Sequence, residues 1–97
     1  MTRTMVRYRL RPDQAPLNEE LIRGVFEELR ELRPETFSYR VFVLDDGVSV
    51  VHIIEYEGAN PLPGLASFER YSADVRERLE DGPVFSELRE IGSIAGG

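Results

Sequence analysis

The feature that most constrains this chain is a pair of apolar segments joined by a short turn. Residues 37–45 and 48–57 are rich in Val, Ile, Phe and Tyr, which are residues that favour strands. They flank the dipeptide Asp46-Gly47, a favoured two-residue hairpin turn. The sequence therefore predicts an antiparallel hairpin in which Val43 lies opposite Val50 and Val41 lies opposite His52. A three-residue turn with a bulge is the alternative, and it would shift this register by one residue.

Because side chains alternate along a strand, the predicted register sorts the hairpin residues into two faces. One face collects Phe37, Tyr39, Val41, Val43, Val50, His52, Ile54 and Tyr56. The other face collects Ser38, Arg40, Phe42, Leu44, Ser49, Val51, Ile53 and Glu55. The second face is apolar in its middle, so neither face reads as one that is simply exposed to water.

The segments around the hairpin complete a six-element order. Residues 3–11 alternate between apolar and polar side chains, as in a strand, and residues 14–33 carry apolar side chains at helical spacing. A second helix is predicted over residues 65–81, with Gly82 and Pro83 as its stop, and a last strand over residues 86–94. The order β-α-β-β-α-β predicts one α+β domain over residues 1–97. Its fold should be ferredoxin-like, with an antiparallel sheet and both helices on one face.

The second, half-apolar face of the hairpin needs a cover in such a fold. Exposed apolar patches of this kind mark interfaces, and two sheets can pack face to face across a two-fold axis. We therefore expect a homodimer formed through the sheet face.

Composition excludes several classes of function. The net charge is −6 and the basic residues are all arginine, which argues against general binding of nucleic acid. There is no cysteine, so disulfides, thiolate chemistry and cysteine-type zinc sites are ruled out. With one histidine in the chain, a His-rich metal site would have to be shared between subunits. We expect neither a metal nor another cofactor.

No apolar stretch approaches the length needed to span a bilayer. The basic N-terminus is not followed by the apolar region of a secretory signal. We therefore expect a cytoplasmic protein without a membrane partner.

Four segments resemble a known family. They are the first strand VRYRLRP, the hairpin YRVFVLDDGVSVVHIIEYEG, the second helix FERYSADVRERL and the ending GPVFSELREIGSI. Over nearly its full length the chain is similar to the dimeric α+β barrel superfamily, and most closely to small proteins grouped with antibiotic biosynthesis monooxygenases. The resemblance implies a dimeric α+β barrel with a ligand pocket in each subunit, between the helices and the sheet. Some members oxidise aromatic polyketides or quinols with oxygen and without metal or flavin.

The same resemblance also disfavours one branch of the superfamily. Members that degrade haem use an Asn, a Trp and a helical His. This chain has no Trp, and its one histidine is expected on a strand.

His52 is the side chain best suited to acid–base chemistry near neutral pH. It lies within an apolar strand, so it is a candidate base or ligand donor in a pocket. The alternative is a neutral, hydrogen-bonded histidine in a core or interface.

Other candidates for ligand binding are aromatic or polar. Tyr8, Tyr39, Tyr56 and Tyr71 could gather in one cavity, where a flat ring with a polar tip suits an aromatic ligand, and Phe68 lies on the apolar face of the second helix. Arg40 belongs to a basic cluster that could attract an anionic substrate, and Asn60 could orient a ligand. The alternatives are core packing for the aromatic residues, a solvated strand face for Arg40 and a turn or cap role for Asn60.

Two functions remain open. One is a cofactor-independent, monooxygenase-like enzyme that acts on a small aromatic or quinone-like compound. The other is a non-catalytic module that binds a small ligand or serves as a structural dimer. A cavity that contains His52 favours the first, and a fully packed layer favours the second.

Overall fold

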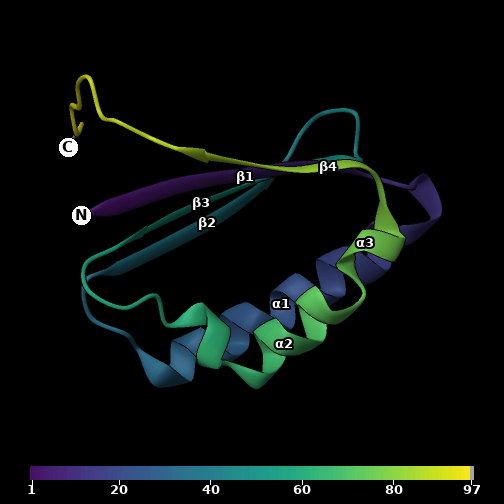
Figure 1. Ribbon diagram of the computed structural model, residues 1–97, viewed down its shortest axis with the longest axis horizontal. Helices are drawn as coiled ribbons and strands as arrows, with labels where there is room; N and C mark the ends of the chain where they lie inside the picture. The colour runs from purple at the N-terminus through teal and green to yellow at the C-terminus, as the bar shows by residue number, and fades with distance from the viewer. Residues whose placement is uncertain (97) are drawn as a thin grey trace.

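The computed structural model describes residues 1–96 and consists of one sheet covered on one face by helices. The strands are β1 (Thr2–Leu10), β2 (Phe37–Val43), β3 (Ser49–Tyr56) and β4 (Leu79–Glu87). They form an antiparallel sheet in the order β2-β3-β1-β4. The helices α1 (Ala15–Leu32) and α2 (Ala66–Ala73) lie side by side on the same side of the sheet (Figure 1). This arrangement confirms the predicted ferredoxin-like fold.

The register predicted for the β2–β3 hairpin is confirmed. Val43 pairs with Val50, and Val41 pairs with His52. The connection is longer than the predicted two-residue turn, because β2 ends at Val43 and β3 begins at Ser49. The Asp46 carboxylate accepts hydrogen bonds from the backbone N–H groups of Val48 and Ser49, which stabilises this longer loop without changing the register.

The prediction was wrong near the C-terminus, where the second helix ends sooner and the last strand begins sooner. A short helix, α3 (Val75–Arg78), follows α2 and leads directly into β4, which starts at Leu79 rather than residue 86. Leu79 is buried and pairs with Leu10 of β1. Gly82, expected as a helix stop, instead lies inside β4 with a φ of +92° at an irregularity in the pairing with β1. A positive φ suits a β-bulge as well as a helix end, which is why the sequence signal was misleading.

Helix α1 packs one stripe of side chains against the sheet. Ile22, Val25 and Leu29 are buried at helical spacing, and the same stripe carries the buried polar residue Asn18. The 3₁₀ turns η1 (Pro12–Gln14) and η2 (Leu62–Gly64) precede α1 and α2. The core thus lies between the helices and one sheet face, and it contains polar groups that need partners.

Candidate functional site

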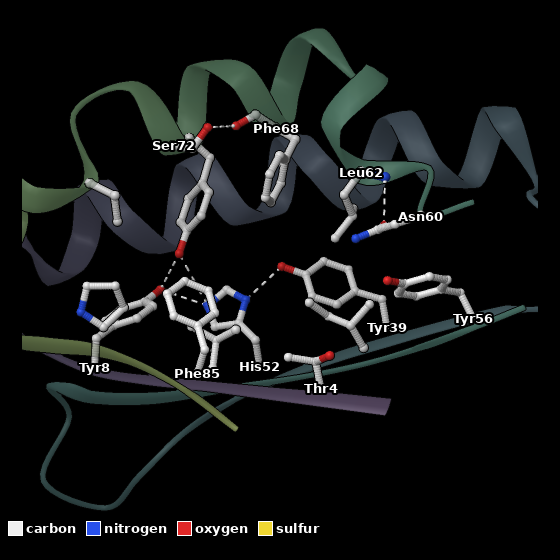
Figure 2. A pocket seen from close by; sticks show the side chains of 15 residues that line it. Thr4, Tyr8, Tyr39, His52, Tyr56, Asn60, Leu62, Phe68, Ser72 and Phe85 are labelled. Atoms are coloured by element: carbon white, nitrogen blue, oxygen red, sulfur yellow. Dashed lines mark hydrogen bonds between the residues drawn. The ribbon is translucent and has the colours of Figure 1, made fainter. Parts of the chain in front are cut away.

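A cavity of about 300 Å³ lies between α2 and the sheet. Figure 2 shows side chains reaching into it from the strands on one side and from the helical layer on the other. Its walls are formed by Thr4, Val6, Tyr8, Tyr39, His52, Ile54, Tyr56, Asn60, Leu62, Phe68, Tyr71, Ser72, Val75, Pro83 and Phe85. The lining is mostly apolar and aromatic, with a few polar groups, which is the usual make-up of a small-molecule pocket.

The structure brings together nearly all the residues that the sequence singled out. His52 lines this cavity together with the four tyrosines, Asn60 and Phe68. Arg40 does not, because it pairs with Ile53 on the opposite face of the sheet, where its guanidinium lies 5.6 Å from the ring centre of Phe42. A ligand in the cavity therefore does not meet the side chain of Arg40.

Asn60 and Tyr56 lie at the end of the cavity away from Tyr8 (Figure 2). The Asn60 side-chain oxygen accepts a hydrogen bond of 3.0 Å from the backbone N–H of Leu62, which is the turn role foreseen as the alternative. That bond uses the amide oxygen of Asn60.

His52 lies at the centre of the sheet face that the helices cover. The strand β3 runs between β1 and β2, and the direct neighbours of His52 on those strands are Val6 and Val41. Tyr8 and Tyr39 lie opposite residues two positions from His52, which are diagonal positions that aromatic side chains can bridge.

Both ring nitrogens of His52 contact tyrosine hydroxyls. Nε2 lies 2.8 Å from the hydroxyl oxygen of Tyr8, and Nδ1 lies 2.7 Å from that of Tyr39. His52 is buried, and the residue is 3% exposed. The hydrogen-bonding capacity of the ring is thus satisfied from both sides by groups that themselves line the cavity.

The network continues into the helices. The Tyr71 hydroxyl donates to the Tyr8 oxygen over 2.8 Å, and Nδ2 of Asn18 donates to the same oxygen over 3.0 Å. Arg78 lies behind them: its Nε donates to Oδ1 of Asn18 over 3.1 Å, and its Nη2 donates to the backbone carbonyl oxygen of Tyr71 over 2.6 Å. We call the hydrogen-bonded set Tyr8, Asn18, Tyr39, His52, Tyr71 and Arg78 the His52 network.

Asn18 and Arg78 were not identified from the sequence. Asn18 lies one helical turn before Ile22 on the buried stripe of α1, so the spacing could have shown that it points into the core. Arg78 gives no comparable signal, since α3 is a single turn and two other arginines are close by in the sequence.

Burial controls the protonation of the network. It lowers the pKa of His52 to about 4, since desolvation disfavours the charged imidazolium. It raises the pKa of Tyr39 and of Tyr71 far above the ordinary value. The pKa of Tyr8 is also raised by burial, although hydrogen bonds from Tyr71 and Asn18 and the charge of Arg78 oppose the shift. At neutral pH the imidazole and all three phenols are therefore uncharged.

Arg78 is the charged member of the network and is 3% exposed. Within residues 1–96 no carboxylate forms an ion pair with it. Its charge is met by the two oxygen acceptors described above and by the ring of Tyr71, whose centre lies 5.3 Å from the guanidinium carbon. Arg78 thus places a positive charge beside Tyr8 and Tyr71 at the inner end of the cavity.

This arrangement can bind an oxygen atom of a flat ligand and alter its protonation. Hydroxyl groups offer donors and acceptors, the aromatic walls suit a ring, and the nearby guanidinium favours negative charge. Among residues 1–96 no cluster of three or more His, Asp or Glu side chains is placed to hold a metal ion. In the same part of the chain no helix is long and apolar enough to cross a membrane.

Comparison with known proteins gives a fold relationship. No protein-family model matches the chain, and no curated protein sequence matches it. Solved structures do match over almost the whole length. An antibiotic biosynthesis monooxygenase is 17% identical with a TM-score of 0.76, and the match covers 95% of this chain and 100% of the other.

Two more solved structures widen the comparison. The protein Rv0793 from Mycobacterium tuberculosis is 20% identical with a TM-score of 0.75, over 97% of this chain and 98% of the other. The L-rhamnose mutarotase FA22100 from Formosa agariphila is 16% identical with a TM-score of 0.58, over 96% and 98%. At these identities the likeness shows the fold. It confirms the resemblance to antibiotic biosynthesis monooxygenase-like proteins that the sequence suggested.

Proposed function

We propose that this protein is a cofactor-independent, monooxygenase-like enzyme that acts on a small hydroxylated aromatic or quinone-like compound. The observation that carries the proposal is the position of His52, held between two tyrosine hydroxyls in the wall of an apolar cavity of about 300 Å³. The likeness in fold to an antibiotic biosynthesis monooxygenase supports the same class of reaction.

In the proposed reaction the cavity binds the ring, and the His52 network holds the oxygen of the ligand and favours its deprotonated form. A phenolate is electron-rich at its ring carbons and can reduce molecular oxygen directly. A ring carbon of the substrate that carries a hydrogen gains one oxygen atom and becomes a carbonyl carbon. The other oxygen atom leaves as water together with the two hydrogens that the substrate loses, so phenol plus O₂ gives quinone plus water.

A homodimer formed through the sheet face completes the proposal. Phe42 and Val84 are on the sheet face away from the helices and are 48% and 43% exposed. Leu44 is 45% exposed and shares a surface hollow with Val51 and Val84. A second copy of the chain would cover this apolar surface.

A non-catalytic ligand-binding module is the second candidate. It is favoured by the low pKa of His52, about 4, because a histidine with so low a pKa is a weak base toward a phenol. In that case the network serves to orient a ligand.

Oxygen uptake separates the two candidates. Purified protein should be mixed with 1-naphthol, 1,8-dihydroxyanthrone and naphthalene, and both binding and O₂ consumption should be measured. Consumption with a hydroxylated ring, lost in His52→Gln, supports the enzyme. Binding without consumption supports the module, and neither binding nor consumption would rule out both.

A further inference from the structure

The buried arginine determines how the side chain of Asn18 is oriented. A guanidinium can only donate hydrogen bonds, so the Asn18 atom that faces Arg78 must be the carbonyl oxygen. The amide nitrogen of Asn18 therefore faces Tyr8, at 3.0 Å. Since an NH₂ group only donates, the Tyr8 oxygen must accept this bond.

The remaining bonds of Tyr8 then follow. A phenol oxygen has two lone pairs and one hydrogen. Asn18 donates to one lone pair, and the Tyr71 hydroxyl, which lies 2.8 Å from the Tyr8 oxygen but 3.4 Å from Nε2 of His52, donates to the other. The hydrogen of Tyr8 is left for Nε2 of His52, 2.8 Å away. Nε2 is thus an acceptor, and a neutral imidazole with an accepting Nε2 carries its hydrogen on Nδ1.

The last bond of the chain reaches the cavity. Nδ1–H of His52 donates to the Tyr39 oxygen, 2.7 Å away. Within residues 1–96 the Tyr39 hydroxyl has no other hydrogen-bond partner, and its side chain lines the cavity. The hydrogen of Tyr39 is therefore left for a bound molecule.

We propose that Arg78 and Asn18 fix the direction of hydrogen bonding through the His52 network, so that Tyr39 donates to an acceptor oxygen of the ligand. That oxygen is a carbonyl, as in a quinone, or a phenolate. Arg78 and Asn18 are positioning residues in this scheme, since they act through Tyr8 and His52. The part that concerns the ligand rests on the proposed function.

The single histidine makes the direction of the network measurable. The ¹⁵N chemical shifts of His52 in histidine-labelled protein distinguish the two neutral tautomers, and no other histidine overlaps them. The wild-type protein should carry the hydrogen on Nδ1. A hydrogen on Nε2 would overturn the proposal.

The variant Asn18→Asp should reverse the direction. Its carboxylate can still accept from Arg78 but cannot donate to Tyr8, so Tyr8 turns its hydrogen toward residue 18. Nε2–H of His52 then donates to the freed Tyr8 oxygen, and Tyr39 donates to Nδ1. The hydrogen of His52 should therefore move from Nδ1 to Nε2, and an unchanged tautomer contradicts the proposal.

Tyr71→Phe is the matched control. It also removes a donor to Tyr8, but Asn18 still donates there, and Nε2 remains the acceptor for the Tyr8 hydrogen. The Nδ1–H tautomer should persist. If Tyr71→Phe shifts the hydrogen to Nε2, then Tyr71 and not the Arg78–Asn18 pair sets the direction. If Asn18→Asp does not fold, the wild-type tautomer and this control still decide the question.

Ligand preference tests the role of Tyr39. The probe 1,4-naphthoquinone carries only acceptor oxygens, and naphthalene carries none; the chain has no Cys or Lys side chain for the quinone to modify. The wild type should bind the quinone about tenfold more tightly, the effect of one hydrogen bond. Tyr39→Phe should abolish that preference, whereas Arg40→Gln, on the opposite face of the sheet, should keep it.

Equal binding of the two probes by the wild type would overturn the role of Tyr39 as donor. Failure of both probes to bind would instead count against the proposed function. The tautomer of His52 would then still show whether Arg78 and Asn18 direct the network.

Discussion

The guanidinium of Arg78 donates a hydrogen bond of 3.1 Å to the side-chain oxygen of Asn18, a residue 60 positions earlier in the chain. The bond is buried and joins α1 to the short helix α3. The same bond therefore holds α1 and α3 together and orients the side chain of Asn18, which contacts Tyr8 next to His52.

Arg78→Met should therefore destabilise the protein by about 2–4 kcal/mol, because it leaves the Asn18 and Tyr71 oxygens without their charged donor. Urea unfolding measures the loss. Arg76→Met, an exposed neighbour on the same short helix, is the control and should stay within about 0.5 kcal/mol of wild type. Equal losses in both variants would show that the buried bonds contribute nothing.

Tyr8→Phe should be more costly than Tyr71→Phe. The Tyr8 oxygen contacts Asn18, His52 and Tyr71, so its removal takes one buried hydrogen-bond partner from each of these three residues. Removal of the Tyr71 hydroxyl deprives Tyr8 of one donor and removes a long contact of 3.4 Å with Nε2 of His52, but the bonds of Tyr8 to Asn18 and His52 stay in place. We expect about 2–4 kcal/mol for Tyr8→Phe and about 1 kcal/mol for Tyr71→Phe. Equal costs in chemical denaturation would argue against Tyr8 as the centre of the network.

Folding stability should fall in mild acid because of His52. Its pKa is about 4 in the folded protein and ordinarily 6.5, so the unfolded chain binds a proton first as the pH falls. The stabilisation is fully present above pH 6.5 and is lost between pH 6.5 and 4. At ~1.4 kcal/mol per pKa unit, the loss amounts to about 3 kcal/mol.

The variant His52→Gln isolates the contribution of His52 to the pH dependence of stability, because glutamine does not titrate. The carboxylates are the same in both proteins, so their effect cancels in the comparison. The difference in unfolding free energy between wild type and variant should shrink as the pH is lowered from 7 to 4. A difference that stays constant would mean that the pKa of His52 is the same in both states.

Two glycines should respond to alanine in opposite directions. Gly82 has a φ of +92°, and an added Cβ would lie 3.0 Å from the backbone oxygen of Arg7, so Gly82→Ala should cost about 2 kcal/mol or more. Gly24 lies within α1 with open space around the added carbon, so Gly24→Ala should stabilise by about 0.5–1 kcal/mol. Thermal melts of the two variants should shift to opposite sides of wild type.

Sedimentation should detect a homodimer of about twice the 11.1 kDa chain mass. Phe42→Glu places a charge on the exposed sheet face and should yield monomers. Leu32→Glu changes an apolar residue on α1 that is 55% exposed, against 48% for Phe42, and should leave the dimer intact. A wild-type monomer at micromolar concentration would refute the dimer.

The sequence was sufficient to predict the parts of the fold that depend on local periodicity. Alternation in β1 predicted the first strand, and the apolar hairpin predicted the register that places Tyr39 and His52 on one face. The prediction that Gly82 ends the second helix was wrong, because a glycine with positive φ occurs both at helix ends and in β-bulges. Whether the strand begins at Leu79 depends on its pairing with Leu10, a long-range contact that local patterns do not contain.

The site was predictable where aromatic residues share a sheet face, and less so where polar groups come from helices. Tyr8, Tyr39 and His52 follow from strand register. Asn18 was detectable from its place on the buried stripe of α1, but its pairing with Arg78 depends on how two helical segments pack. Arg78 lies between Glu77 and Glu80 in the sequence, and such alternation of charges is typical of a solvated helix face rather than of a buried arginine.

The loop between β2 and β3 has a consequence for how this protein tolerates change. Asp46 lies on the surface, far along the strands from the cavity, yet its bonds to Val48 and Ser49 stabilise the loop that spans β2 and β3. Adding or deleting one residue in this loop would shift the register of the hairpin by one residue. Every side chain of one strand would then lie on the other face of the sheet relative to its neighbours on the second strand. His52 and Tyr39 would then project to opposite sides of the sheet, so the length of a distant exposed loop is as much a determinant of the site as any residue inside it.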